Sequence, residues 1–226
     1  MSVDFVANYA RHIPEVEDRI KRHQIDTLVC GIGPTAWLLP WMDQRVVRPL
    51  RIWGTHDFCR VYRADDIVLM DDTSQHLNVN GDRYKAILAS RPQRFWIYQT
   101  RYDFWLSHLP NAVHGICKTV DWNVHQPDLL PPPDMIDKYP FPLEDELPHT
   151  SLVSPLGATT LAWREGCRRI GVLGVDMLPH HHTGQMNIPL AVDSFYSRIA
   201  KEAAEKGGCI VNLSPVSSLT RWRAMA

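Results

Sequence analysis

Short apolar segments alternating with helical segments are the feature that most restricts how this chain can fold. The apolar segments are too short to be helices, and several are rich in branched and aromatic residues, which favour strands. Strands are predicted at 26–30, 50–53, 66–70, 94–98, 112–116, 169–176 and 209–212. Strands separated by helices pair in parallel, because a parallel connection needs a crossover. The sequence therefore predicts an α/β fold, with a mostly parallel sheet covered by helices on both faces.

The predicted helices are recognised by their ends. Pro14 and the acidic residues after it begin the first helix, which is predicted to run to Gln24. The clearest helix runs from Leu190 to Lys206 and is followed by Gly207. Other helices are predicted at 82–90, at 154–166, after 214–215, and from residue 35 to an early break at Pro40.

Residues 125–149 interrupt this pattern. The segment contains seven prolines, which exclude regular helix or strand, yet it also carries large apolar side chains. We interpret it as an ordered, irregular wrap or lid. The chain of 226 residues is predicted to form a single domain, 1–226, that includes this segment.

Composition excludes several classes of protein. The net charge of −1 argues against broad coating of nucleic acid or of anionic membrane, since both need an excess of basic residues. Five cysteines without a C-x-x-C motif indicate reduced thiols. The chain shows no signal peptide and no apolar run long enough to span a bilayer. We therefore expect a cytoplasmic protein, and a homo-oligomer is left open.

Unusual residues follow the predicted strands. In a parallel sheet the carboxyl ends of the strands lie at one edge, where ligands bind. The residues at these ends are Gly31, Gly33, Thr55, His56, Asp71, Asp72, Asp176 and the segment 212–215. The sequence therefore predicts a ligand site along this edge.

The turn Gly31-Ile32-Gly33 has two interpretations. Its backbone N–H groups can be offered to a phosphate, as in glycine-rich nucleotide loops. It lacks the third glycine of G-x-G-x-x-G and the Lys-Ser/Thr of a P-loop. A tight strand-to-helix turn with no ligand explains the same residues.

Asp71-Asp72 and His180-His181-His182 also have alternatives. The paired carboxylates can hold a divalent metal with phosphates, cap a helix or bind a ribose. Adjacent histidines in an extended loop point in different directions, so the three do not fit one metal well. A single histidine acting as general base fits better, because imidazole titrates near neutral pH. A solvated polar loop is the alternative.

Three segments in order resemble one superfamily. TLVCGIGPTA (27–36), SPLGATTLAWREGCRRIGVLGVDM (154–177) and CIVNLSPVSSL (209–219) resemble blocks of the bacterial sialyltransferases that use CMP-sialic acid. The related pterin-diphosphokinase-like proteins share the same opening motif. Residues 80–150 have no counterpart. The resemblance implies a Rossmann-like glycosyltransferase that moves a sugar from a nucleotide-sugar donor to an acceptor hydroxyl.

The resemblance also implies roles for individual residues. Gly31 and Gly33 would lie against the donor phosphate, and Ser154, at the start of a helix, would face the donor. His56 and Asp71 or Asp72 stand where nucleotide contacts are expected, and Thr55, Gly157 and Asp176 complete the nucleotide-binding set. His182, with His181 beside it, stands near the general base that deprotonates the acceptor. Pro155 replaces a glycine of the family, and tyrosines expected after Asp176 are missing.

Substrates and cofactors follow from the same resemblance. The nucleotide-sugar is a co-substrate, no cofactor is tightly bound, no metal ligands are assigned, and Mg²⁺ is compatible but not required. The acceptor is a small molecule, a glycan or a modified nucleobase. A modified nucleobase as acceptor fits the small stand-alone members of this superfamily that bacteriophages encode. Such a protein would act in the host cytoplasm.

Two other functions stay open from the sequence. One is an Mg²⁺-dependent diphosphokinase that transfers pyrophosphate from ATP to a pterin-like alcohol, in which Asp71 and Asp72 would be essential. The other is a non-catalytic nucleotide-binding module, which the missing tyrosines and Pro155 keep open.

Overall fold

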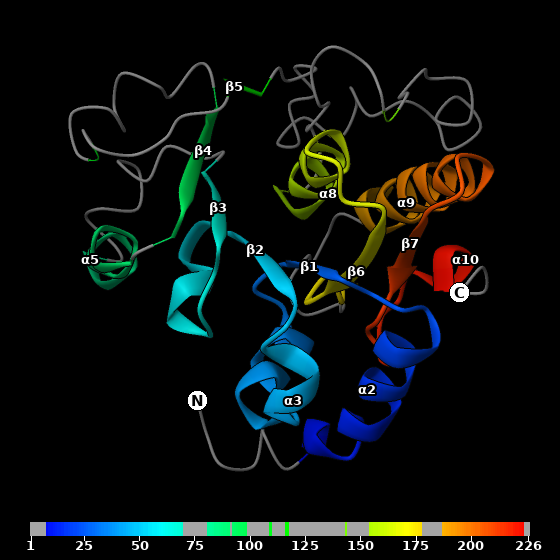
Figure 1. Cartoon of the computed structure of the whole chain (residues 1–226), viewed down its shortest axis with the longest axis horizontal. Helices are drawn as coiled ribbons and strands as arrows, with labels where there is room; N and C mark the ends of the chain where they lie inside the picture. The colour runs from blue at the N-terminus through cyan, green and yellow to red at the C-terminus, as the bar shows by residue number, and fades with distance from the viewer. Residues whose placement is uncertain are drawn as a thin grey trace.

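A seven-stranded parallel sheet forms the centre of the protein, with strand order β5-β4-β3-β2-β1-β6-β7 (Figure 1). The computed structural model describes residues 8–69, 81–90, 92–98, 109, 116–117, 143, 154–177 and 187–223. The strands are β1 (Thr27–Cys30), β2 (Arg51–Thr55), β3 (Asp66–Leu69), β4 (Arg94–Tyr98), β5 (Ile116–Cys117), β6 (Arg169–Leu173) and β7 (Cys209–Asn212). All neighbouring pairs are parallel. The predicted α/β, Rossmann-like fold is confirmed.

The strand order reverses direction at β1. The chain builds outward from β1 to β5 on one side, then returns to place β6 and β7 on the other side. β1 therefore pairs with both β2 and β6, with Cys30 opposite Gly54 on one side and Leu173 on the other. The carboxyl ends of β1 and β6 are the topological switch point, where open α/β sheets bind ligands.

Helices cover both faces of the sheet (Figure 1). One face carries α8 (Ser154–Arg164), α9 (Asn187–Glu205) and α10 (Thr220–Arg223). The other carries α2 (Ile13–Arg22), the 3₁₀ segments η1 (Pro34–Trp41) and η2 (His56–Arg60), α3 (Gln44–Val47) and α5 (Gly81–Ala89). Successive side chains of a strand point to opposite faces. Val29 accordingly packs under α8 and α9, while Leu28 and Cys30 pack on the α2 side.

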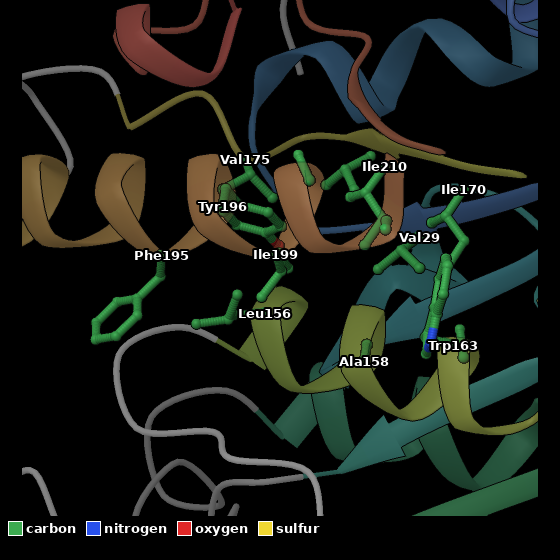
Figure 2. Packing of buried hydrophobic residues seen from close by; sticks show 14 of the residues in the cluster. Val29, Leu156, Ala158, Trp163, Ile170, Val175, Phe195, Tyr196, Ile199 and Ile210 are labelled. Atoms are coloured by element: carbon green, nitrogen blue, oxygen red, sulfur yellow. The ribbon is translucent and has the colours of Figure 1, made fainter. Parts of the chain in front are cut away.

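The core beneath α8 and α9 is rich in aromatic residues. Figure 2 shows Trp163 of α8 near Val29 and Ile170, and Tyr196 of α9 near Val175. Tyr196 stacks on Trp222 of α10, with ring centroids 4.0 Å apart. Leu143 also belongs to this core, and its backbone N–H donates to both carboxylate oxygens of Glu202 at 3.1 Å. The rest of the Pro-rich segment 125–149 lies outside the described residues, so the predicted lid stays a prediction.

A buried ionic network joins β2, β3 and β4 at the amino edge of the sheet. Asp66 is fully buried, and its carboxylate accepts hydrogen bonds from Arg51 Nε (2.9 Å), Arg94 Nε (2.8 Å) and Trp96 Nε1 (2.9 Å). Arg94 also contacts Glu165 at the end of α8. Burial raises the pKa of Asp66, and the hydrogen bonds from Trp96 and Arg51 oppose that rise. The network thus fastens three strands and α8 at the edge away from the switch point.

Several element boundaries differ from the prediction. β6 ends at Leu173 rather than near residue 176, because Gly174 turns the chain with φ +75°. The segment from Thr35 is a 3₁₀ helix that contains Pro40, and α3 was not predicted. β5 begins at Ile116, and residues 112–115 lie outside the described part.

The cysteines and the helices bear on the expectations drawn from composition. Cys30, Cys59, Cys167 and Cys209 are free thiols. Within the described part of the chain, no helix has both the length and the apolar character needed to cross a bilayer.

Candidate functional site

The loops after β1 and β6 are joined backbone to backbone at the switch point. Gly31 N–H donates to Leu173 O, and Gly33 N–H donates to Gly174 O, each at 2.9 Å. Both N–H groups are therefore engaged inside the protein. Neither meets a phosphate without leaving its carbonyl partner, so the glycine pair is not a ready phosphate cradle in this structure.

Close packing explains why glycine occupies both positions. A Cβ at Gly31 would lie 2.5 Å from Gly174 O, and a Cβ at Gly33 would lie 2.6 Å from the same atom. Real Cβ atoms do not approach an oxygen so closely. The Cβ position of Gly31 is also 3.1 Å from Pro155 Cγ at the start of α8. The turn thus brings β1, β6 and α8 together, and whether Gly31 and Gly33 also contact a ligand stays a prediction.

Asp176 joins the same two loops through its side chain. Its carboxylate accepts the N–H of Thr35 at 2.8 Å and the hydroxyl of Thr35 at 2.7 Å. The Thr35 hydroxyl oxygen in turn accepts the N–H of Gly174 at 3.0 Å. Asp176 is 2% exposed and Thr35 is fully buried. The contacts give Asp176 a structural role at the switch point, and its predicted nucleotide contact stays a prediction.

Thr35→Val should lower the free energy of unfolding by about 2–6 kcal/mol. Valine keeps the shape but leaves an oxygen of Asp176 and the N–H of Gly174 without their partner, and each such loss costs about 1–3 kcal/mol. Urea unfolding followed by tryptophan fluorescence measures the change. The control is Thr55→Val, which removes a single 3.2 Å bond to Cys30 O and should cost about 1 kcal/mol. Equal costs for the two variants would contradict the role given to Asp176.

His56 and Ser154 meet at the carboxyl end of β2. His56 Nε2 lies 2.5 Å from Ser154 Oγ, although the residues are 98 positions apart in the chain. Ser154 is the first residue of α8, whose amino end favours negative charge. His56 is 7% exposed and has φ 48°, a left-handed conformation that is strained for a non-glycine residue. Two predicted site residues from distant parts of the chain are therefore in contact at one helix terminus.

Thr55 and Gly157 lie beside this contact. The Thr55 hydroxyl donates to Cys30 O, which joins the ends of β1 and β2. Gly157 is buried in α8, and its carbonyl accepts the hydroxyl of Thr160 at 3.0 Å. Their predicted nucleotide contacts stay predictions.

Four predicted site residues lie outside the described part of the chain: Asp71, Asp72, His181 and His182. The segments that carry them follow β3 and precede α9. Within the described ranges, no group of three or more His, Cys, Asp or Glu side chains is placed to hold a metal ion.

The loop after β7 also reaches the switch point. Ser218 N–H donates to Asp176 O at 3.0 Å, and the Ser217 hydroxyl donates to Val175 O at 3.2 Å. Asn212 Nδ2 and Ser214 Oγ are buried without a hydrogen-bond partner among the described residues. Sequence reasoning placed 212–215 at this edge, but it missed Thr35. The only sequence signal for Thr35 is that it follows the Gly-x-Gly-Pro turn.

The chain is similar to several solved protein structures. No protein-family model matches the chain, and no curated protein matches it. The chain is similar to sialyltransferase CstII from Campylobacter jejuni in complex with the substrate analogue CMP-3FNeuAc, with 12% identity, a TM-score of 0.47, and coverage of 87% of this chain and 84% of that one. It is also similar to an alpha-2,3-sialyltransferase from Campylobacter jejuni in apo form, with 10% identity, a TM-score of 0.47, and coverage of 88% and 79%. Such values transfer no substrate, activity or residue role to the chain.

Proposed function

We propose that the protein is a glycosyltransferase that uses a nucleotide-sugar donor. The observation that carries the proposal is the 2.5 Å contact between His56 Nε2 and Ser154 Oγ beside the switch point. The resemblance to the sialyltransferases implies a nucleotide contact for His56 and a donor-facing position for Ser154. A phosphate at the amino end of α8 would gain from the helix dipole and from a hydrogen bond donated by the Ser154 hydroxyl.

The donor phosphate would then lie at the start of α8 and not at the glycine turn. The N–H groups of Gly31 and Gly33 hold the loop against Leu173 O and Gly174 O, so the turn shapes the site. Ser154 and His56 form one hydrogen bond with each other, so one of the two atoms is its acceptor. When His56 Nε2 is the donor, the Ser154 hydroxyl is left to donate to a ligand oxygen. His182 would then act as the base that takes the proton from the acceptor hydroxyl as that oxygen attacks the anomeric carbon, breaks its bond to the phosphate and displaces the nucleotide.

A thermal-shift panel with CMP, UDP, GDP, dTDP and ATP, each with and without Mg²⁺, tests this proposal. A ligand at 100 times its Kd adds about 2.7 kcal/mol to the free energy of unfolding. We expect one pyrimidine nucleotide to raise the melting temperature whether or not metal is present. Ser154→Ala should remove most of that shift, whereas the control Ser90→Ala, which removes a hydroxyl bond to Ile87 O after α5, should keep it.

Other outcomes of the panel identify other functions. A shift that needs both ATP and Mg²⁺ would indicate the diphosphokinase. Nucleotide binding without turnover of any nucleotide-sugar would indicate a non-catalytic module. An absence of any shift would overturn the proposal.

A further inference from the structure

The tip of the turn after β1 is an exposed apolar side chain. Among the described residues, two large hydrophobic side chains are exposed: Ile32 at 47% and Trp41 at 64%. Ile32 stands between Gly31 and Gly33, at the switch point of the sheet. A single exposed hydrophobic residue is ordinary on a protein surface. Its place at the edge where α/β sheets bind ligands is what distinguishes Ile32.

The surrounding contacts restrict what this turn can offer a ligand. The N–H groups of Gly31 and Gly33 are bonded to Leu173 O and Gly174 O, and Thr35 N–H is bonded to Asp176. Glycines carry no side chain, and no larger residue fits at these positions because of Gly174 O. With the N–H groups of Gly31 and Gly33 bonded inside the protein, the exposed side chain of Ile32 is the apolar surface that this segment offers to a ligand. It is apolar, so it suits the face of a ring and not a phosphate.

The turn lies beside the proposed phosphate site. The Cβ position of Gly31 is 3.1 Å from Pro155 Cγ, and Pro155 follows Ser154. A nucleotide whose phosphate meets Ser154 and His56 would carry its ribose and base along this same edge of the sheet. Covering Ile32 with a ring would remove exposed apolar surface from water, which is favourable.

We propose that Ile32 is a specificity-determining residue that packs against the nucleoside of the bound nucleotide, while the phosphate is held at Ser154 and His56. This inference rests on the proposed function. It assigns the Gly-x-Gly turn to recognition of the ring and not of the phosphate.

Calorimetric titration of wild type, Ile32→Ala and Trp41→Ala tests the inference. The probes are CMP, UDP, GDP, dTDP and ATP, with ribose 5-phosphate as a phosphate that lacks a base. Ile32→Ala should weaken binding of the preferred nucleotide about tenfold, because three carbon atoms of the contact are lost, each worth about 0.8 kcal/mol when fully buried. Binding of ribose 5-phosphate should change less than about twofold, since phosphate recognition is intact.

Two further variants separate the loss of nucleotide binding in Ile32→Ala from an effect of removing any exposed hydrophobic side chain. Trp41 is the other exposed hydrophobic residue and lies at the far end of η1, so Trp41→Ala should bind the nucleotide as wild type does. Ile32→Leu keeps the apolar area and should keep most of the affinity. All three variants should unfold at the wild-type denaturant midpoint within error, because both side chains are exposed. The heat-capacity change of nucleotide binding should be less negative for Ile32→Ala, as expected for less apolar burial.

Three results would overturn the inference. Ile32→Ala binding the nucleotide as tightly as wild type would exclude contact with the ring. An equal loss with Trp41→Ala, or an equal loss for ribose 5-phosphate, would show that the effect is not specific to Ile32 and the nucleoside. If wild type binds none of the five nucleotides, the proposed function itself fails, and this inference fails with it.

Discussion

Asp66→Asn should lower the free energy of unfolding by about 3 kcal/mol. The fully buried carboxylate accepts bonds from Arg51, Arg94 and Trp96, and asparagine replaces one accepting oxygen by an NH₂ group that faces these donors. Removing one partner of a buried ion pair costs about 3–5 kcal/mol. The low end is expected, because the side chains of Arg51 and Arg94 are 34% and 23% exposed and regain some hydration.

Urea unfolding compared with Glu165→Gln measures this effect. Glu165 pairs with Arg94 in the same network, but its side chain is 32% exposed, so its loss should cost below about 1 kcal/mol. The Trp53–Trp96 stack, with centroids 5.6 Å apart, lies beside the network, so near-UV circular dichroism should change with Asp66→Asn. Similar costs for the two variants would show that burial does not strengthen the pairing of Asp66.

His182→Ala should abolish glycosyl transfer while nucleotide binding is retained. A general base contributes about 10²–10⁴-fold to rate, because it removes the proton as the acceptor oxygen attacks. The readout is kcat/KM for transfer from the nucleotide-sugar that corresponds to the nucleotide found in the panel. The melting-temperature shift with that nucleotide, measured on the same protein, should be unchanged.

The neighbouring histidines provide the controls. Because the side chains of consecutive residues point in different directions, we expect a single histidine of 180–182 to act as the base. His180→Ala should keep the wild-type rate. Full loss with His181→Ala and none with His182→Ala would move the role to His181. Turnover at the wild-type rate in both variants would exclude a base in this segment.

The sheet was predictable from sequence because its signal is local. A buried parallel strand such as β1 or β6 is an apolar run, and glycine or acidic residues follow it where the chain leaves the sheet. The ends of these apolar runs also predicted the edge of the sheet where the candidate site lies, since the carboxyl ends of parallel strands share one edge. The predicted end of a strand was wrong where the conformation of one residue decides it. Gly174, with its positive φ, ends β6 before residue 176.

The chemistry at the site was decided by tertiary contacts. In the sequence, the Gly31-Ile32-Gly33 turn fits a phosphate-binding loop and a plain turn equally well. Only the positions of Leu173 O and Gly174 O show that the N–H groups of Gly31 and Gly33 are bonded inside the protein. Nothing local marks Thr35 as the partner of Asp176, because the two are 141 residues apart.

By itself, therefore, the sequence determined the fold class, the strands and the edge where unusual residues collect, since these depend on hydrophobic pattern and on parallel pairing. Only the tertiary structure decided which polar groups there are already bonded and which meet each other. His56 and Ser154 come together because β2 and α8 pack on each other, and hydrogen bonds between distant segments depend on packing geometry that no local pattern encodes.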